Sequence, residues 1–449
     1  MMDELTTRWR QFRRDLERRL TWSRLYRVTS YAQSALWIVP FISIILVYII
    51  GPIVRALDES FHWQLTGLGV KGAEALYQTV ITLTLTFLVF TFGSLLVAIQ
   101  IAGGQLTPRI IATTLLRDNV VRYTVSLLVF TLMFSVTASN RLEDQVLDLV
   151  TVIVAALGIA SIAAFLFLID YAARLLRPVS ILARVSEEAL AVIKSVYPDE
   201  ATDGDVDEAH DPAVLPESPR RVVCHSGQSS ILLAVDLETL MKEARRSLGT
   251  VELVPQVGDF VATDEPLFIL HGGAVAIDDH TLHAAAALGP ERTIEQDPMF
   301  GFRILVDIGL KALSPAINDP TTAVLALDQL QRLLRVVGRR RLRGEVLTDG
   351  LGNPRVIYRT PNWEDFMHVS CTEIRACGAN NVQVARRLRA MLVHLASAVP
   401  AHRHAAIEAE LRKLDLSLPP LYPIPEDLAL ARIPDSQGLG GSSGTPAGR

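Results

Sequence analysis

The chain is poor in cysteine and lacks two of the short motifs that mark common enzyme classes. Its three cysteines, Cys224, Cys371 and Cys377, show no CxxC spacing, which argues against disulfides and against a cysteine-based zinc site. We interpret them as small buried thiols. Neither a P-loop nor an HExxH motif is present. We therefore assign no catalytic residue and no cofactor, leave metal binding open, and regard an enzyme as the less favoured class.

Positive charge is also not in excess. The sequence has 43 lysines and arginines against 48 acidic residues, which gives a formal net charge of −5. Nucleic acid is therefore not an expected partner.

Apolar residues, in contrast, are abundant. Hydrophobic residues make up 50% of the chain, and the mean hydropathy is +0.30, which is unusual for a wholly soluble protein of this size. Four windows with almost no charge are each long enough to cross about 30 Å of hydrocarbon. They cover residues 35–54, 76–102, 121–138 and 149–169. We therefore predict a four-helix transmembrane domain over residues 31–178.

The distribution of arginine predicts how these helices are oriented. Residues 1–30 carry eight arginines against four acids. Two of the loops are poor in basic residues, whereas the ends of the second and fourth windows are followed by arginines: Arg109, Arg117, Arg122, Arg174, Arg177 and Arg184. Because cytoplasmic loops are enriched in lysine and arginine, we predict a multi-pass membrane protein with both termini in the cytoplasm.

Three segments outside these windows have distinct compositions. Residues 1–30 predict a basic amphipathic helix on the anionic inner leaflet, although a plain positively charged flank would give the same pattern. Residues 199–219 hold eight acids and several prolines and predict an acidic linker. The tail over residues 436–449 is rich in glycine and serine and is predicted to be disordered.

The C-terminal half predicts a cytoplasmic α+β domain, so the fold class is a membrane all-α unit joined to an α+β domain. Residues 220–275 show short β patterns around a helix that Asp236 starts and Gly249 stops. The run from Gly258 resembles a turn and strand of barrel-sandwich modules, which predicts a small barrel-like unit. Residues 285–418 predict a helical subdomain, with a hairpin near 345–348 and 354–359 and helices near 298–313, 320–338, 362–376, 379–398 and 401–414.

The second apolar window carries a polar stripe. Thr79, Thr82 and Thr86 are three and four residues apart and therefore share one helix face. With Gln100 and Gln105 at the cytoplasmic end, they are candidate pore-lining residues. Interhelical hydrogen bonds, or bonds from threonine to its own helix backbone, explain the same pattern and are the favoured alternative.

The most polar and specific stretch covers residues 291–323. Asp297-Pro298 and Asp319-Pro320 each predict a helix start, because aspartate caps free N–H groups and proline fits the first helical position. Ser314-Pro315 predicts the end of the first of these helices. These caps and the stop, together with a stripe of charged residues between them, account for about half of the stretch.

The rest of the stretch has several interpretations. Arg303, Asp307 and Lys311 are four residues apart and predict two consecutive ion pairs. Two helix starts with nearby hydroxyls could bind an anion, whereas carboxylates with an asparagine could hold Mg²⁺ or Ca²⁺. A purely structural role is also open. The candidate ligand-binding residues are Arg292, Thr293, Gln296, Asp297, Arg303, Asp307, Asn318, Asp319, Thr321 and Thr322.

The order of these residues resembles a known family, the bacterial predicted membrane proteins of domain of unknown function 2254. The resemblance covers about residues 30–415, with mild departures at Gly309, at Lys311 and at Leu106-Thr107. It implies a four-helix unit in the bacterial inner membrane with a cytoplasmic domain, and it implies no activity. The matching elements are Gln105-Leu106-Thr107-Pro108-Arg109, Gly258-Asp259-Phe260-Val261, Arg292-Thr293, Gln296-Asp297, Phe300-Gly301, Val306-Asp307-Ile308, Ala312-Leu313-Ser314-Pro315 and Ile317-Asn318-Asp319-Pro320.

Three functions follow as hypotheses. The favoured one is a homo-oligomeric channel- or transport-related protein whose cytoplasmic domain senses a ligand or assists assembly. The second is a membrane-anchored enzyme or ligand sensor built on the polar stretch from Arg292 to Thr322. The third is a structural scaffold. The lipid bilayer and further copies of the chain are the expected partners.

Overall fold

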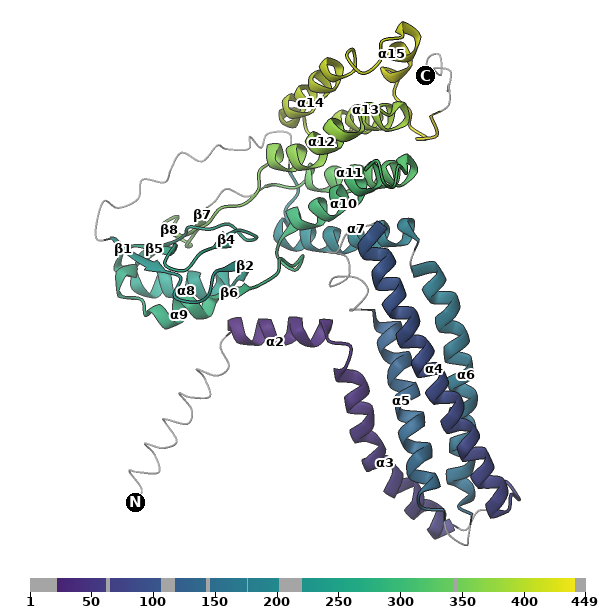
Figure 1. Ribbon diagram of the computed structural model, residues 1–449. Helices are drawn as coiled ribbons and strands as arrows, with labels where there is room; N and C mark the ends of the chain where they lie inside the picture. Colours follow the sequence, from purple (N-terminus) through teal and green to yellow (C-terminus); the bar gives the residue numbers. More distant parts are fainter. Residues whose placement is uncertain are drawn as a thin grey trace, which may run out of the picture. The chain divides into compact units, whose positions relative to one another are not determined.

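The computed structural model describes residues 22–61, 65–105, 118–142, 146–175, 177–201, 220–342 and 346–440. It divides into two compact units (Figure 1). The membrane unit is Tyr31–Ile181, and the C-terminal unit combines the residues from Leu182 onward with those up to Ser30. The first described helix is α2 (Trp22–Ser34). Most of the expected amphipathic helix, residues 202–219 of the expected acidic linker and the tail after residue 440 lie outside the described residues.

Within its described residues, the membrane unit contains four helices that are long and apolar enough to cross a membrane, as predicted. They are α3 (Ile38–Phe61), α4 (Val70–Gln105), α5 (Asn119–Ser139) and α6 (Asp148–Leu175). Helix α5 packs against the other three. Half of its apolar window is buried (50%), against 11% for α3 and 22% for α4 and α6. Helix α5 is therefore the core of the unit, and its neighbours present most of their apolar surface outward.

Two buried carboxylates tie the ends of these helices together. Asp118 caps the first turn of α5 and also accepts a hydrogen bond from the hydroxyl of Tyr171 on α6. Asp58, near the end of α3, accepts from the N–H groups of Leu149 and Val150 at 2.8 and 3.2 Å. Because a helix start has N–H groups without an internal partner, each carboxylate satisfies backbone donors and joins two helices.

The C-terminal unit contains two open sheets rather than the predicted barrel. The first has the strand order β1-β5-β3-β8-β7, and the second has the order β4-β2-β6. Among the described residues, the two edge strands of each sheet do not pair with each other, so neither sheet closes into a barrel. The strands are β1 (Arg220–Cys224), β2 (Ser230–Val235), β3 (Gly249–Leu253), β4 (Phe260–Val261), β5 (Pro266–Gly272), β6 (Ala286–Gly289), β7 (Val346–Thr348) and β8 (Pro354–Ile357).

The two sheets draw on both of the subdomains expected from the sequence. Strand β8 pairs in parallel with β3, through Val251 opposite Val356, and β6 pairs antiparallel with β2. Side chains from both sheets pack into one apolar core that includes Leu232, Val251 and Phe268. The β-rich region and the strands after residue 285 therefore share a core.

The helices of the C-terminal unit follow the predicted pattern closely. Helix α8 (Leu237–Ser247) begins at its predicted cap, Asp236, and the predicted hairpin is formed by β7 and β8. The other helices are α7 (Pro178–Val196), α9 (Asp279–Ala285), α10 (Pro298–Ala312), α11 (Pro320–Val337), α12 (Trp363–Gly378), α13 (Val382–Ala396), α14 (His404–Ser417) and α15 (Pro425–Ala431).

Two local predictions were wrong. Helix α8 ends at Leu248, which adopts a left-handed φ of 53°, whereas Gly249 is already the first residue of β3. Gly249 is needed there for space, since a Cβ atom would lie 2.6 Å from the Cβ of Ala274. Of the three cysteines, only Cys371 is buried, and the other two are exposed.

The described part of the C-terminal tail, up to Gly440, is held by hydrogen bonds. Asp435 is 2% exposed and accepts hydrogen bonds from the N–H groups of Gly438 and Gly440, at 3.0 and 2.8 Å. Arg386 of α13 donates to the carbonyl oxygens of Ile433 and Gly440. These bonds hold the segment against α13, which composition alone does not reveal.

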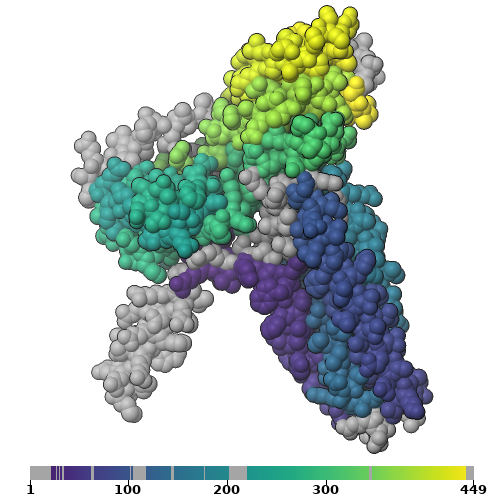
Figure 2. Space-filling model, viewed as in Figure 1, coloured from purple at the N-terminus to yellow at the C-terminus, as the bar shows by residue number. Residues whose placement is uncertain are grey.

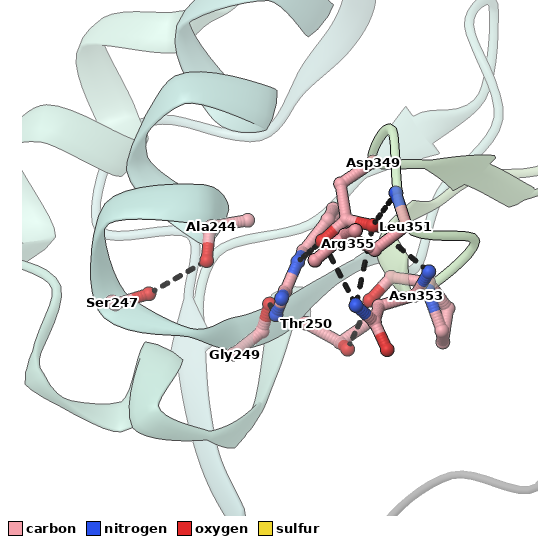
Figure 3. Close-up of polar contacts among 9 residues, drawn as sticks. Ala244, Ser247, Gly249, Thr250, Asp349, Leu351, Asn353 and Arg355 are labelled. Atoms are coloured by element: carbon pink, nitrogen blue, oxygen red, sulfur yellow. Dashed lines mark hydrogen bonds and ion pairs between the residues drawn. The ribbon is translucent and has the colours of Figure 1, made fainter.

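One carboxylate organises the loop between β7 and β8 (Figure 3). Asp349 accepts from the N–H groups of Leu351 and Asn353, at 2.9 and 3.0 Å, and from Nε of Arg355 at 2.9 Å. Arg355 also donates to the carbonyl oxygen of Gly249, so the loop is fixed to β3. Burial by itself would raise the pKa of Asp349, but these hydrogen bonds outweigh it and hold the pKa below its usual range.

The substitution Asp349→Asn should lower the Tm at neutral pH, because it removes the ion pair with Arg355. A carboxyl group with a depressed folded pKa contributes stability above its unfolded pKa of about 3.9 and loses that contribution as the pH falls further. The Tm difference from wild type should therefore be largest near neutral pH and shrink below about pH 4. Thermal unfolding at several pH values measures this, and a pH-independent difference would contradict the assignment.

Candidate functional site

The start of α10 is built around the carboxylate of Asp297. This side chain is 2% exposed and accepts from the N–H group of Phe300 at 3.1 Å, as a helix cap does. It also forms an ion pair with Arg292, whose guanidinium carbon lies 5.6 Å from the centre of the Phe300 ring. The predicted Asp-Pro start is confirmed, and Arg292 supplies the counter-charge for its buried acid.

A glycine from the β-rich region allows this pair to form. Gly258 has a φ of +97°, and a Cβ atom there would lie 2.6 Å from Oδ2 of Asp297. The N–H group of Gly258 donates to the carbonyl oxygen of Leu232 on β2 at 2.7 Å. A larger residue would be strained at this φ and would displace the pair.

Gln296 and Thr293 complete the first polar group. Oε1 of Gln296 accepts from the N–H group of Val235 at 3.0 Å, which attaches the start of α10 to the end of β2. The hydroxyl oxygen of Thr293 is buried and has no hydrogen-bond partner among the described residues. Backbone and ion-pair contacts thus occupy three of the four polar side chains in this group.

Gln296 and Asp297 line a cleft of about 500 Å³ within the C-terminal unit. Three aromatic side chains, Trp22, Tyr197 and Tyr358, form part of its wall. Burial raises the pKa of Asp297 and that of Tyr197. A concave site of this volume with a few polar groups is typical of small-molecule binding. The other lining residues include Asp236, Leu237, Leu253, Gln256, Val257, Pro298, Leu347, Arg359, Thr360 and Pro361.

The start of α11 forms a second, separate group. Asp319 caps this helix by accepting from the N–H group and the hydroxyl of Thr322, at 3.1 and 2.5 Å. Asn318 adopts a left-handed φ of 50°, a conformation that asparagine tolerates, and Asn318 and Thr321 are exposed. Helix α10 packs along α11 and has 15 residues, which gives it a length of about 22 Å. The starts of α10 and α11 lie at opposite ends of this length. The ten candidate residues therefore do not converge on one site.

The central stripe joins two helices. Arg303 pairs with Asp307 at 2.6 Å and also donates to Glu373 of α12 at 3.0 Å. The Arg303 guanidinium holds the pKa of Glu373 below its usual range. Lys311 is exposed and makes no ion pair among the described residues, so the second predicted pair is wrong. The second ion pair of the stripe is instead formed by Arg303 with Glu373, a residue distant in the sequence.

The candidate pore-lining threonines lie on the outer face of α4. Thr79, Thr82 and Thr86 are exposed, and Figure 2 shows α4, in blue, on the visible surface of the membrane unit. The hydroxyl of Thr79 donates to the carbonyl oxygen of residue 75 at 2.7 Å, and that of Thr86 to residue 82 at 2.8 Å. Gln100 is exposed, and the side chain of Gln105 lies outside the described part of the structure.

Sequence reasoning missed a set of hydroxyls inside the membrane unit. Thr84 and Thr91 of α4 are buried, and their hydroxyl oxygens have no hydrogen-bond partner within the described ranges. In the same interior, Ser161 of α6 donates to Thr131 of α5 at 3.1 Å. The spacing of Tyr77, Thr84 and Thr91, seven residues each, was the available signal, because it places them on one helix face.

These features define a membrane protein with four apolar helices and a C-terminal unit of mixed sheets and helices. Residues 33–394 match the family described as predicted membrane protein, domain of unknown function 2254, and the chain belongs to this family. Uncharacterized proteins of Mycobacterium bovis and Mycobacterium tuberculosis are each 26% identical over 401 residues, which covers 86% of this chain and 76% of theirs. No solved structure matches the chain. The resemblance seen in the sequence is thus confirmed.

The substitution Arg292→Gln should destabilise the C-terminal unit, because it leaves the buried carboxylate of Asp297 without its counter-charge. Removing one partner of an ion pair lowers the free energy of unfolding by about 3–5 kcal/mol when the pair is fully buried and by about 0–1 kcal/mol when it is exposed. Arg292 is 32% exposed, so we expect an intermediate loss of about 2 kcal/mol.

The matched control adds Asp297→Asn, which keeps the helix cap and removes the charge. The double variant should be more stable than Arg292→Gln alone when thermal unfolding is compared. If the second substitution gives no recovery, the buried charge is not the cause of the loss.

Proposed function

We propose that the protein is a ligand-responsive membrane protein, in which the cleft beside Asp297 binds a small molecule and the membrane unit acts as a homo-oligomer in transport. The observation that carries the first part is that Gln296 and Asp297, two residues of the family motif, line this cleft. The proposal also places both termini in the cytoplasm of a bacterial cell, supported by the arginine distribution and the bacterial relatives.

The lining of the cleft indicates the chemistry of its ligand. Tyr197, Tyr358 and Trp22 offer ring faces and edges to a flat apolar group. Arg359 is exposed at the cleft and makes no ion pair among the described residues, and Gln256 adds an amide. An aromatic ring that carries an anionic group matches this combination best.

Indole-3-acetate and 4-hydroxybenzoate are suitable probes, because each combines a ring with a carboxylate. Saturation-transfer NMR on the full-length protein should show binding of at least one. Arg359→Gln should weaken it about tenfold, equivalent to one lost charged contact of about 1.4 kcal/mol. Arg246→Gln is the control, since Arg246 is a 72% exposed arginine of α8 away from the cleft. Absent binding, or equal binding to both variants, speaks against a ligand of this class.

The transport part of the proposal is favoured by the exposed hydroxyl face of α4. Leu128 and Val154 are completely buried, so apolar side chains occupy their part of the interior of a single membrane unit. A polar path would therefore run between copies, along Thr79, Thr82 and Thr86. Hydroxyls that donate to their own helix keep oxygen lone pairs available for water or a cation.

Cysteine crosslinking tests whether this face meets a second copy. In a background with the three native cysteines replaced, Thr82→Cys should form disulfide-linked dimers in membranes. The control Ile159→Cys, at a 70% exposed position on α6, should not. In planar bilayers, Thr86→Val should change the conductance of the purified protein, because it removes a hydroxyl at constant shape. A monomeric, non-conducting protein would instead favour the scaffold or sensor hypotheses.

A further inference from the structure

A strongly basic cleft of about 470 Å³ lies between α7, α11 and α13. It shares no lining residue with the cleft beside Asp297. Two carboxylates, Glu200 and Asp328, face six cationic side chains: Lys194, Arg332, Arg335, Arg339, Arg340 and Arg387. This local excess of positive charge contrasts with the net charge of −5 of the whole chain.

Ion pairs account for only two of these cations. Arg332 pairs with Glu187 of α7, and Arg387 pairs with Asp328 of α11, each at 2.7 Å. The first pair is exposed on both sides and contributes little to stability. After these two pairs, Glu200 is the remaining carboxylate of the cleft.

The other four cations form no ion pair among the described residues, and one carboxylate, Glu200, remains to offset them. Arg339 and Arg340 donate to the backbone carbonyl oxygens of residues 398 and 198, which satisfies N–H groups without neutralising them. Lys194 and Arg335 are exposed and make no ion pair within the described ranges of the chain. Like charges held this close repel one another, so an anion in the cleft would relieve the repulsion.

Arg387 provides an independent sign that the cleft is suited to an anion. The residue is 6% exposed, and its Nε and Nη2 are held by Asp328 and Gln331, both at 2.7 Å. Its Nη1 is buried and has no hydrogen-bond partner among the described residues. A buried guanidinium N–H without an acceptor is costly, and the residue that carries it lines the cleft.

We propose that this cleft binds a phosphate-bearing anion, with Arg387 as the buried anchor and Lys194 and Arg335 as outer contacts. Guanidinium groups match the oxygen geometry of phosphate, and several together outweigh its cost of dehydration. A soluble polyphosphate or phosphate ester and the headgroup of an anionic lipid share this chemistry. The site is independent of the ligand and transport functions proposed above.

Titration of the full-length protein with inorganic tripolyphosphate tests the site. The protein is held in phosphatidylcholine nanodiscs, and isothermal titration calorimetry measures the Kd. Arg335→Gln and Lys194→Gln change exposed side chains and so preserve the fold, and each should weaken binding about tenfold. Arg412→Gln, at a 68% exposed arginine of α14, is the control and should bind as wild type does. Binding should also weaken as salt is raised.

Nanodiscs that contain phosphatidylglycerol distinguish the two sources of phosphate. If the headgroup occupies the cleft, this lipid should weaken tripolyphosphate binding to the wild type more than to the Arg335→Gln variant. If the ligand is soluble, both proteins should respond equally to the lipid. The proposal is overturned if tripolyphosphate does not bind in phosphatidylcholine, or if Arg335→Gln and Lys194→Gln bind it as tightly as the wild type.

Discussion

The C-terminal unit depends on placing one carboxylate, that of Asp297, out of water. The acid is acceptable there only because the N–H group of Phe300 and the guanidinium of Arg292 both reach it. That arrangement in turn requires a glycine at position 258 and fixes the neighbouring Gln296 against β2. The start of the first motif helix, the turn at Gly258 and the end of β2 are therefore held together around a single buried charge.

The membrane unit obeys a related constraint, because hydrocarbon offers no hydrogen bonds to polar groups. Its buried carboxylates, Asp58 and Asp118, lie at helix ends, where they accept hydrogen bonds from backbone N–H groups. Two threonines on the outer face of α4 donate to their own helix. The hydroxyls of Thr84, Thr91 and Ser135 are exceptions, since they are buried in the described bundle and unpaired. They mark the interior as more polar than stability requires.

Local signals made much of this architecture predictable. Apolar windows of membrane length and Asp-Pro helix starts depend only on neighbouring residues, and both were found at the expected positions. Long-range pairing was not predictable, because no local pattern joins β3 to β8 or Arg303 to Glu373. For the same reason, the polar stretch that the sequence suggested as one site forms two groups at opposite ends of α10. The sequence around Arg387 likewise did not indicate the basic cleft.

The parallel pairing of β3 with β8 determines what the β-rich region can do on its own. A fragment that ends at residue 275 would lose β8 from one sheet and β6 from the other. The backbone N–H and C=O groups of β2 and β3 would then face solvent along two open edges, which promote aggregation with other chains. Cleavage after β5 would thus release an insoluble remnant, and the C-terminal unit should be degraded or retained as a whole.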